Sequence, residues 1–121
     1  MNMNILKNLD DETINNDHFR DILYTGKMQL ALMSLPPGKN IGYEIHDNID
    51  QFIQIKKGIA TVSLDDIKHK LRAGDAVIIP SGISHDITNR SDKTYLKIYT
   101  IYSEPQHHIN KINKHKYINT K

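Results

Sequence analysis

Short stretches of apolar or alternating residues, separated by turn-forming residues, run along most of the chain. The separators are rich in Gly, Pro, Asp and Asn, which favour turns. Many short strands at regular spacing are typical of an all-β sandwich or barrel, and no stretch shows a sustained helical repeat. The pattern therefore predicts an all-β fold, with strands at residues 19–24, 28–35, 41–46, 51–57, 59–64, 69–72, 76–79, 86–88 and 95–102.

The separators also indicate how some strands are connected. A short link containing Gly26 joins 19–24 to 28–35 and predicts a hairpin. Four residues separate 41–46 from 51–57, so we expect a second hairpin that brings His46 close to Gln51. Residues 76–79 are apolar on both faces, which predicts a strand buried between two sheets. Residues 1–17 show little periodicity and form a leader that either packs irregularly or contains a short helix near 10–15.

Alternation along the strands indicates which side chains share a face. Successive strand residues point to opposite sides, so Glu44 and His46 share one face and Ile45 the other. Gln51 shares a face with Ile53 and Ile55 by the same rule. We therefore expect Gln51, rather than the neighbouring Asp50, to face the interior.

Length and composition limit the classes of protein. The chain has 121 residues, 38% of them hydrophobic and 25% charged, and this length fits one domain with one modest core. It has no cysteine, so disulfides, thiolate-ligated zinc and thiol catalysis are excluded. No apolar run is long enough to cross a membrane, and the N-terminus lacks the apolar core of a signal peptide. We expect a soluble, cytoplasmic protein of one domain, residues 1–121, with no membrane partner.

The net charge of +2 is distributed unevenly. Residues 105–121 carry four of the 16 Lys and Arg, three His and no acid, which leaves 12 basic against 14 acidic residues in the rest. A basic tail can bind nucleic acid, but a solvated terminus is the more frequent explanation of such a tail. Nucleic acid is therefore not an expected partner.

Two segments carry spaced residues of the kinds that bind metals. In the first, Gly38 and Gly58 frame Glu44, His46 and Gln51. In the second, Gly74, Pro80, Gly82, His85 and Asn89 follow with five, one, two and three residues between them. These segments resemble the two sequence motifs of the cupin family. The second matches at every position. The first keeps the family's spacing, but Glu44 stands in place of a His and Gln51 in place of a Glu.

The resemblance covers about residues 19–102 and extends to the flanking strands. It is closest to small cupins loosely labelled as related to mannose-6-phosphate isomerase, in which the first motif also reads as one His followed by Asp-Gln. It implies a cupin double-stranded β-helix (a jelly-roll barrel), with a short irregular N-terminal leader and a basic C-terminal tail. It also implies that Glu44, His46, Gln51 and His85 hold one divalent metal ion in the barrel.

The donor set is consistent with several metals. Two imidazoles and a carboxylate suit Zn, Fe, Mn or Ni, whereas the neutral amide of Gln51 is a poorer ligand than a carboxylate. The alternative is a pocket that binds no metal and is held together by hydrogen bonds alone. His107 and His108 could add a ligand, although adjacent residues seldom bind one ion together. Tyr95, Tyr99 and Tyr102 are candidates for the pocket or an interface.

Two functions are consistent with this site. The first is a metal-dependent enzyme, an isomerase or an oxygenase, acting on a small polar metabolite such as a sugar derivative. The second is a non-catalytic module that binds or senses a small ligand, and the sequence shows no separate general base that would favour catalysis. Small cupins commonly pair, and a barrel of this size has edge strands to protect, so we expect a homodimer.

Overall fold

The structure is a computed structural model that describes residues 5–106 and 112–113. Within these residues the elements, in chain order, are α1 (Leu9–Asn15), β1 (Arg20–Thr25), β2 (Gln29–Leu35), β3 (Gln51–Lys57), β4 (Ile59–Leu64), β5 (Ile67–Arg72), β6 (Ala76–Ile79), β7 (His85–Asn89), β8 (Leu96–Tyr102) and β9 (Ile112–Asn113).

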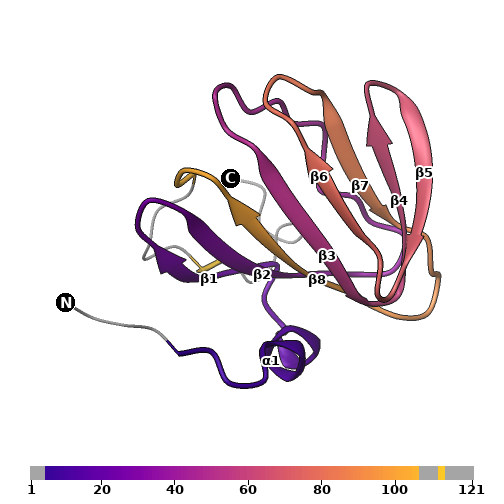
Figure 1. Cartoon of the computed structure of the whole chain (residues 1–121). Coiled ribbons are helices and arrows are strands. Elements are labelled where there is room, and N and C mark those ends of the chain that lie inside the picture. The colour runs from indigo at the N-terminus through magenta and orange to yellow at the C-terminus, as the bar shows by residue number, and fades with distance from the viewer. Residues whose placement is uncertain (1–4, 107–111, 114–121) are drawn as a thin grey trace.

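The strands form two antiparallel sheets that pack face to face (Figure 1). The larger sheet has the order β6-β3-β8-β2-β1-β9, and the smaller has the order β5-β4-β7. The predicted all-β jelly-roll fold is confirmed. Most of the predicted basic tail, residues 105–121, lies outside the described residues, and so do His107 and His108.

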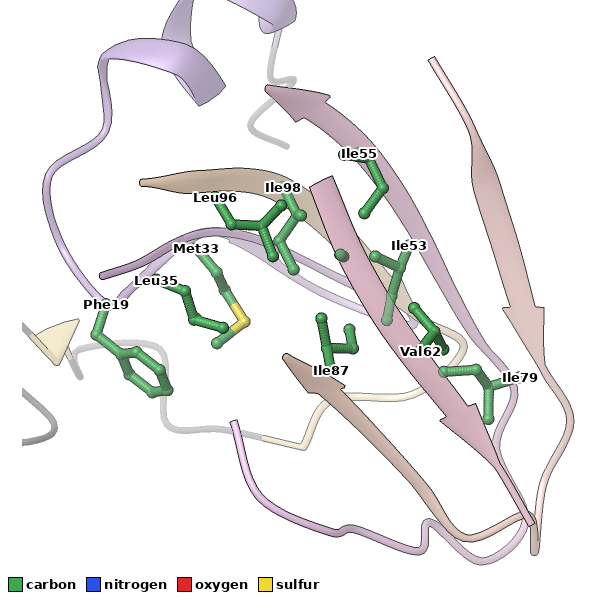
Figure 2. Close-up of a cluster of buried hydrophobic side chains, with 11 residues drawn as sticks. Phe19, Met33, Leu35, Ile53, Ile55, Val62, Ile79, Ile87, Leu96 and Ile98 are labelled. Carbon is green, nitrogen blue, oxygen red and sulfur yellow. The ribbon is translucent and has the colours of Figure 1, made fainter. Parts of the chain in front are cut away.

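The core lies between the two sheets, as alternation along the strands requires (Figure 2). Ile53 and Ile55 on β3 point inward from the larger sheet, and Val62 on β4 and Ile87 on β7 meet them from the smaller one. The chain passes between the sheets at Gly58, whose φ of +103° favours glycine. A Cβ there would lie 3.3 Å from the Cα of Leu96, so a larger residue would also crowd the start of β8.

The leader contains a short helix rather than being irregular throughout. The Asn8 side chain accepts a hydrogen bond from the Asp11 amide at the start of α1. Three acidic residues follow in the first turn, where their negative charges stabilise the helix by interacting with the positive end of its dipole. The helix packs near β8 and β3. The buried Lys97 ammonium on β8 holds the C-terminal end of α1 in place. It donates hydrogen bonds to the Asn16 carbonyl, just after the helix, and to the Ser34 hydroxyl.

Two sequence predictions about strand pairing are wrong. Residues 41–46 do not form a hairpin with β3. They run as an irregular extended segment beside β7, bridged to it through Asn40–Thr88 and Glu44–His85. Strand β6 is not buried between the sheets but lies at the edge of the larger one, where Ile78 is 65% exposed. Alternation predicts the face of a residue, but pairing depends on distant segments that alternation does not identify.

Asn89 fastens the end of β7 to two loops. Its buried amide nitrogen donates to the carbonyl oxygens of Leu35, Pro36 and Thr94, at 3.1, 3.2 and 2.8 Å, and its oxygen accepts from the Ser91 amide at 2.9 Å. The last position of the second motif therefore has a structural role, which is to join β7 to the loop after β2 and to the loop before β8.

We expect Asn89→Ala to lower the free energy of unfolding by about 3 kcal/mol, because it leaves buried carbonyls without donors. Denaturant unfolding followed by circular dichroism measures this change. Lys93→Ala, at an exposed position in the same loop, is the matched control and should change stability little. Equal stability of the two variants would contradict the structural role of Asn89.

Candidate metal centre

A reciprocal backbone pair brings the first two candidate ligands together. The Glu44 amide donates to the His85 carbonyl and the His85 amide to the Glu44 carbonyl, both at 2.9 Å. Directly opposed residues of an antiparallel pair project to the same face. Both side chains therefore enter the space between the sheets, where Glu44 Oε1 lies 3.8 Å from His85 Nε2.

His46 joins them from two residues further along. Its carbonyl accepts from the Gly82 amide at 2.9 Å, which ties this part of the segment to the turn before β7. Its Nε2 lies 3.4 Å from Glu44 Oε1, and its ring centroid lies 5.3 Å from that of His85. As alternation predicted, Ile45 points away from the site, and Tyr43 does so too; both are more than half exposed. One donor atom from each of Glu44, His46 and His85 lies within 4.8 Å of the others.

The two imidazoles present free donor atoms to the site. His85 Nδ1 lies 2.9 Å from the carbonyl of Ile83, which can only accept, so this nitrogen carries the proton. In neutral imidazole the lone pair is then on Nε2, the arrangement typical of a metal-binding histidine. The Nε2 atoms of both His46 and His85 are buried without a hydrogen-bond partner in the structure. Buried nitrogens without a partner are unusual in a folded protein, and two of them beside one carboxylate fit a bound cation.

Gln51 also places an oxygen in this pocket, and its orientation is fixed by neighbours. Thr100 Oγ1 donates to the Phe52 carbonyl at 2.9 Å and therefore accepts from Gln51 Nε2, also at 2.9 Å. The amide oxygen of Gln51 is then free, and it is buried without a partner. Asp50, in contrast, is exposed and accepts a hydrogen bond from the Ser81 amide. The structure thus brings Glu44, His46 and His85 into one cluster and places Gln51 on the wall of the same pocket.

The segment that carries Glu44 is held in place by Asp86. This buried carboxylate accepts from the Asn40 side chain at 2.8 Å and from the Gly42 amide at 2.9 Å. Gly42 has a φ of +106°, a conformation that side chains rarely adopt. Both Asp86 oxygens are therefore engaged, and the residue positions Glu44 rather than acting on a ligand.

Two pocket residues that lie outside the motifs complete the site. Arg20, the first residue of β1, is buried on the pocket wall, and its charge acts on both Glu44 and Tyr102. Tyr102 on β8 packs edge-on against His46, with ring centroids 5.6 Å apart. Of the three candidate tyrosines, Tyr102 lines the pocket, whereas Tyr99 packs against Phe52 and Tyr95 is 46% exposed. An arginine at the start of a strand gives no periodic signal, so sequence reasoning missed Arg20.

The pocket keeps its carboxylate charged and its phenol neutral. Burial raises the pKa of Glu44, but the adjacent His46, the Arg20 guanidinium and His85 outweigh this and hold the pKa below its ordinary value. Burial raises the pKa of Tyr102 to about 12, even though Arg20 opposes the shift. At neutral pH, Glu44 is an anion, and the Tyr102 phenol keeps its proton.

The chain that carries this site is similar in sequence to a known protein family and to several known proteins. A family model described as "Cupin domain" matches residues 31–102, and the chain therefore belongs to the cupin family. An uncharacterised protein of Acanthamoeba polyphaga mimivirus is 44% identical over 83% of this chain and 65% of its own length. The uncharacterised protein YrkC of Bacillus subtilis is 39% identical over 83% and 57%. The chain thus spans between half and two thirds of the length of these curated relatives.

Solved structures agree with this assignment. A Bacillus halodurans crystal structure is 33% identical and superposes with a TM-score of 0.87 over 91% of this chain and 88% of that one. The predicted cupin resemblance is confirmed. Within the described residues, no helix has the length and apolar character needed to cross a membrane.

The raised pKa of Tyr102 leads to a measurable prediction. A folded-state pKa above the unfolded value stabilises the protein fully below about pH 10, and this stability is lost as pH rises toward 12. In the folded protein, Tyr102→Phe should leave the absorbance change at 295 nm between pH 9 and 10.5 unchanged. In guanidinium chloride, the same variant should reduce the change by about one sixth, because it removes one of six tyrosines. A reduction in the folded protein would contradict the raised pKa.

Proposed function

We propose that the chain is a metal-binding cupin in which Glu44, His46 and His85, with the Gln51 amide oxygen as a fourth donor, hold one divalent ion. The observation that carries this proposal is the meeting of two buried, unpartnered imidazole nitrogens with a carboxylate, all within 4.8 Å. Two His and one carboxylate suit Zn, Fe, Mn or Ni.

The pocket beside this cluster would then bind a small polar metabolite. A bound divalent ion would polarise a carbonyl or hydroxyl group of such a molecule. The chain's own contribution is to orient the donors: the Ile83 carbonyl sets the tautomer of His85, and Thr100 directs the Gln51 oxygen inward. The reaction in this proposal is an isomerisation or an oxidation of a metabolite such as a sugar derivative.

We expect protein purified without a His-tag to bind about one equivalent of Zn²⁺ or Mn²⁺ in equilibrium dialysis followed by elemental analysis. His46→Ala and His85→Ala should each weaken this binding at least about tenfold, because each removes a donor directly. His69→Ala is the matched control, since His69 lies exposed on β5, outside the cluster. Metal binding that survives both substitutions would disprove the proposed centre.

Gln51→Leu tests the fourth donor within the same experiment. The substitution keeps the approximate volume and removes the oxygen that faces the pocket, so it should weaken metal binding less than loss of an imidazole does. Unchanged affinity would remove Gln51 from the ligand set and leave a centre of three residues.

A second candidate function is ligand binding without chemistry. One observation favours it: among the described residues that line the pocket, each carboxylate has another task. Asp86 is engaged by Asn40 and Gly42, and Glu44 faces the two histidines. No carboxylate is thus left as a separate general base in the described pocket. The two functions differ in whether a bound metabolite is consumed, and product formation would decide for the enzyme.

We also propose a homodimer that packs the outer faces of the larger sheets together. Ile78 on β6, Phe52 on β3 and Ile101 on β8 are neighbours in register across that face. Ile78 is 65% exposed, and the other two are half-buried. A row of apolar side chains beside an open edge strand favours association of copies.

Light scattering on a sizing column should therefore give twice the chain mass of 13.9 kDa. Ile78→Lys should shift the protein toward the monomer, because it places a charge in the apolar row. Ile67→Lys is the matched control, since Ile67 is 64% exposed on an edge strand of the other sheet. Dissociation by Ile67→Lys alone would place the interface elsewhere, and a monomeric wild-type protein would reject the dimer.

The single domain over residues 1–121 and the cytoplasmic location stay predictions from the sequence. Truncation of residues 107–121, which include β9, without loss of stability would limit the domain to residues before 107.

A further inference from the structure

Four exposed cations lie on the outer face of the smaller sheet, the face turned away from the core. Leu71 on β5 packs against the core. The alternate residues Lys68, Lys70 and Arg72 therefore point outward, and each is exposed. They follow one another at intervals of about 6.8 Å along the strand. Arg90, directly after β7, borders the same hollow as Lys68 and Lys70.

These positive charges have no anionic partner in the part of the chain that the structure describes. None of the four side chains takes part in its ion pairs. Asp86 is the one carboxylate among the described residues that border the hollow, and it is buried and already engaged by Asn40 and Gly42. Because like charges repel one another, a face with four unpaired cations favours an anionic partner.

The same face is hollowed into an open groove of about 600 Å³. Hydroxyl groups form its floor: Thr61 and Ser63 on β4, and Thr88 on β7, which is the register partner of Thr61. Tyr43, from the segment beside β7, reaches over this floor, and its hydroxyl lies 3.4 Å from Ser63 Oγ. Because Tyr43 is still 58% exposed, the groove offers an aromatic ring as well as positive charge.

The spread of the charges indicates a chain of anions rather than a single ion. From Lys68 to Arg72 the row extends over about 14 Å, which is more than one phosphate or carboxylate group can contact. An acidic peptide also carries repeated anions, but its carboxylates do not stack on an aromatic ring as a nucleobase does. A nucleic-acid duplex is read by a helix or ribbon that enters its groove, whereas this face is hollow.

We propose that this groove binds single-stranded nucleic acid, whose phosphates contact the β5 cations and Arg90 and one of whose bases stacks on Tyr43. A cationic groove with an aromatic ring binds single strands with little dependence on sequence. The sequence expectation of no nucleic-acid partner concerned the basic tail, residues 105–121, which is not part of this surface. The inference rests neither on the proposed metal centre between the sheets nor on the proposed dimer contact, which uses the outer face of the larger sheet.

The first test measures how salt weakens binding of the full chain to a fluorescent oligothymidylate of about 12 nucleotides, followed by anisotropy. The logarithm of the association constant should fall linearly with the logarithm of the salt concentration. The expected slope is about −2.8, about −0.7 for each of four phosphates that a cation neutralises. Lys68→Gln combined with Lys70→Gln should halve this slope to about −1.4. Lys7→Gln combined with Lys27→Gln, at exposed lysines outside the groove, is the matched control and should leave it unchanged.

The second test separates stacking from charge. Tyr43→Ala should weaken binding at least about fivefold without changing the salt slope, because it removes the ring and no cation. Tyr43→Phe keeps the ring and should bind like the wild-type protein. Circular dichroism of each variant verifies that it is folded.

Several outcomes would overturn the inference. One is the absence of oligothymidylate binding by the wild-type protein at low salt. Another is a slope that the two β5 substitutions leave unchanged, or one that Lys114→Gln with Lys116→Gln lowers instead, which would assign the binding to the tail. Equal binding of a polyglutamate peptide of the same charge would show that charge alone is recognised, and tighter binding of a duplex of the same length would also contradict the proposal.

Discussion

The reciprocal backbone pair between Glu44 and His85 is the interaction on which the pocket depends. It attaches an irregular segment to β7 at the point where the candidate ligands begin, and the hydrogen bonds from the Ile41 amide to the Ile87 carbonyl and from the Gly82 amide to the His46 carbonyl hold the segment on either side. Because the two residues are directly opposed, their side chains must enter the same face of the sheet. Asp86 reinforces the pair by binding the same segment at Asn40 and Gly42. The candidate ligands are thus positioned by backbone geometry, with little dependence on the rotamers of long side chains.

Charge placement explains how a carboxylate is tolerated so deep in the fold. Burial alone would favour the neutral acid, but the two imidazoles and Arg20 surround Glu44 and keep it ionised. The same guanidinium sits beside Tyr102, whose burial keeps it protonated. The pocket therefore brings together an anion at Glu44, a cation at Arg20 and a neutral phenol at Tyr102 from distant parts of the chain.

Sequence patterns predicted faces well and neighbours poorly. Alternation placed Glu44, His46 and Gln51 inward, and the spaced second motif located β7, because these features are local. The hairpin expected between residues 41–46 and 51–57 is absent, because the first segment pairs with β7, about forty residues further along the chain. The sequence did not predict that β6 lies at an edge of the larger sheet. The reason is that apolar character alone does not distinguish a central strand from an edge strand whose face is covered by another surface. Arg20 could not be assigned to the pocket, because it is brought there from β1, outside both motifs, by pairing with β2.

The exchange of residue types in the first motif is consistent with this arrangement. With Glu44 in a position where cupins commonly have a His, the anion of the site lies next to His85 and within reach of the charge on Arg20. A carboxylate at position 51 would face Thr100 and could accept its hydrogen only if the hydroxyl turned away from the Phe52 carbonyl. Gln51 avoids this conflict because its amide nitrogen supplies the hydrogen while its oxygen still faces the pocket. Glutamine at position 51 is therefore compatible with the hydrogen bond from Thr100 to the Phe52 carbonyl, and the negative charge is carried by Glu44 instead.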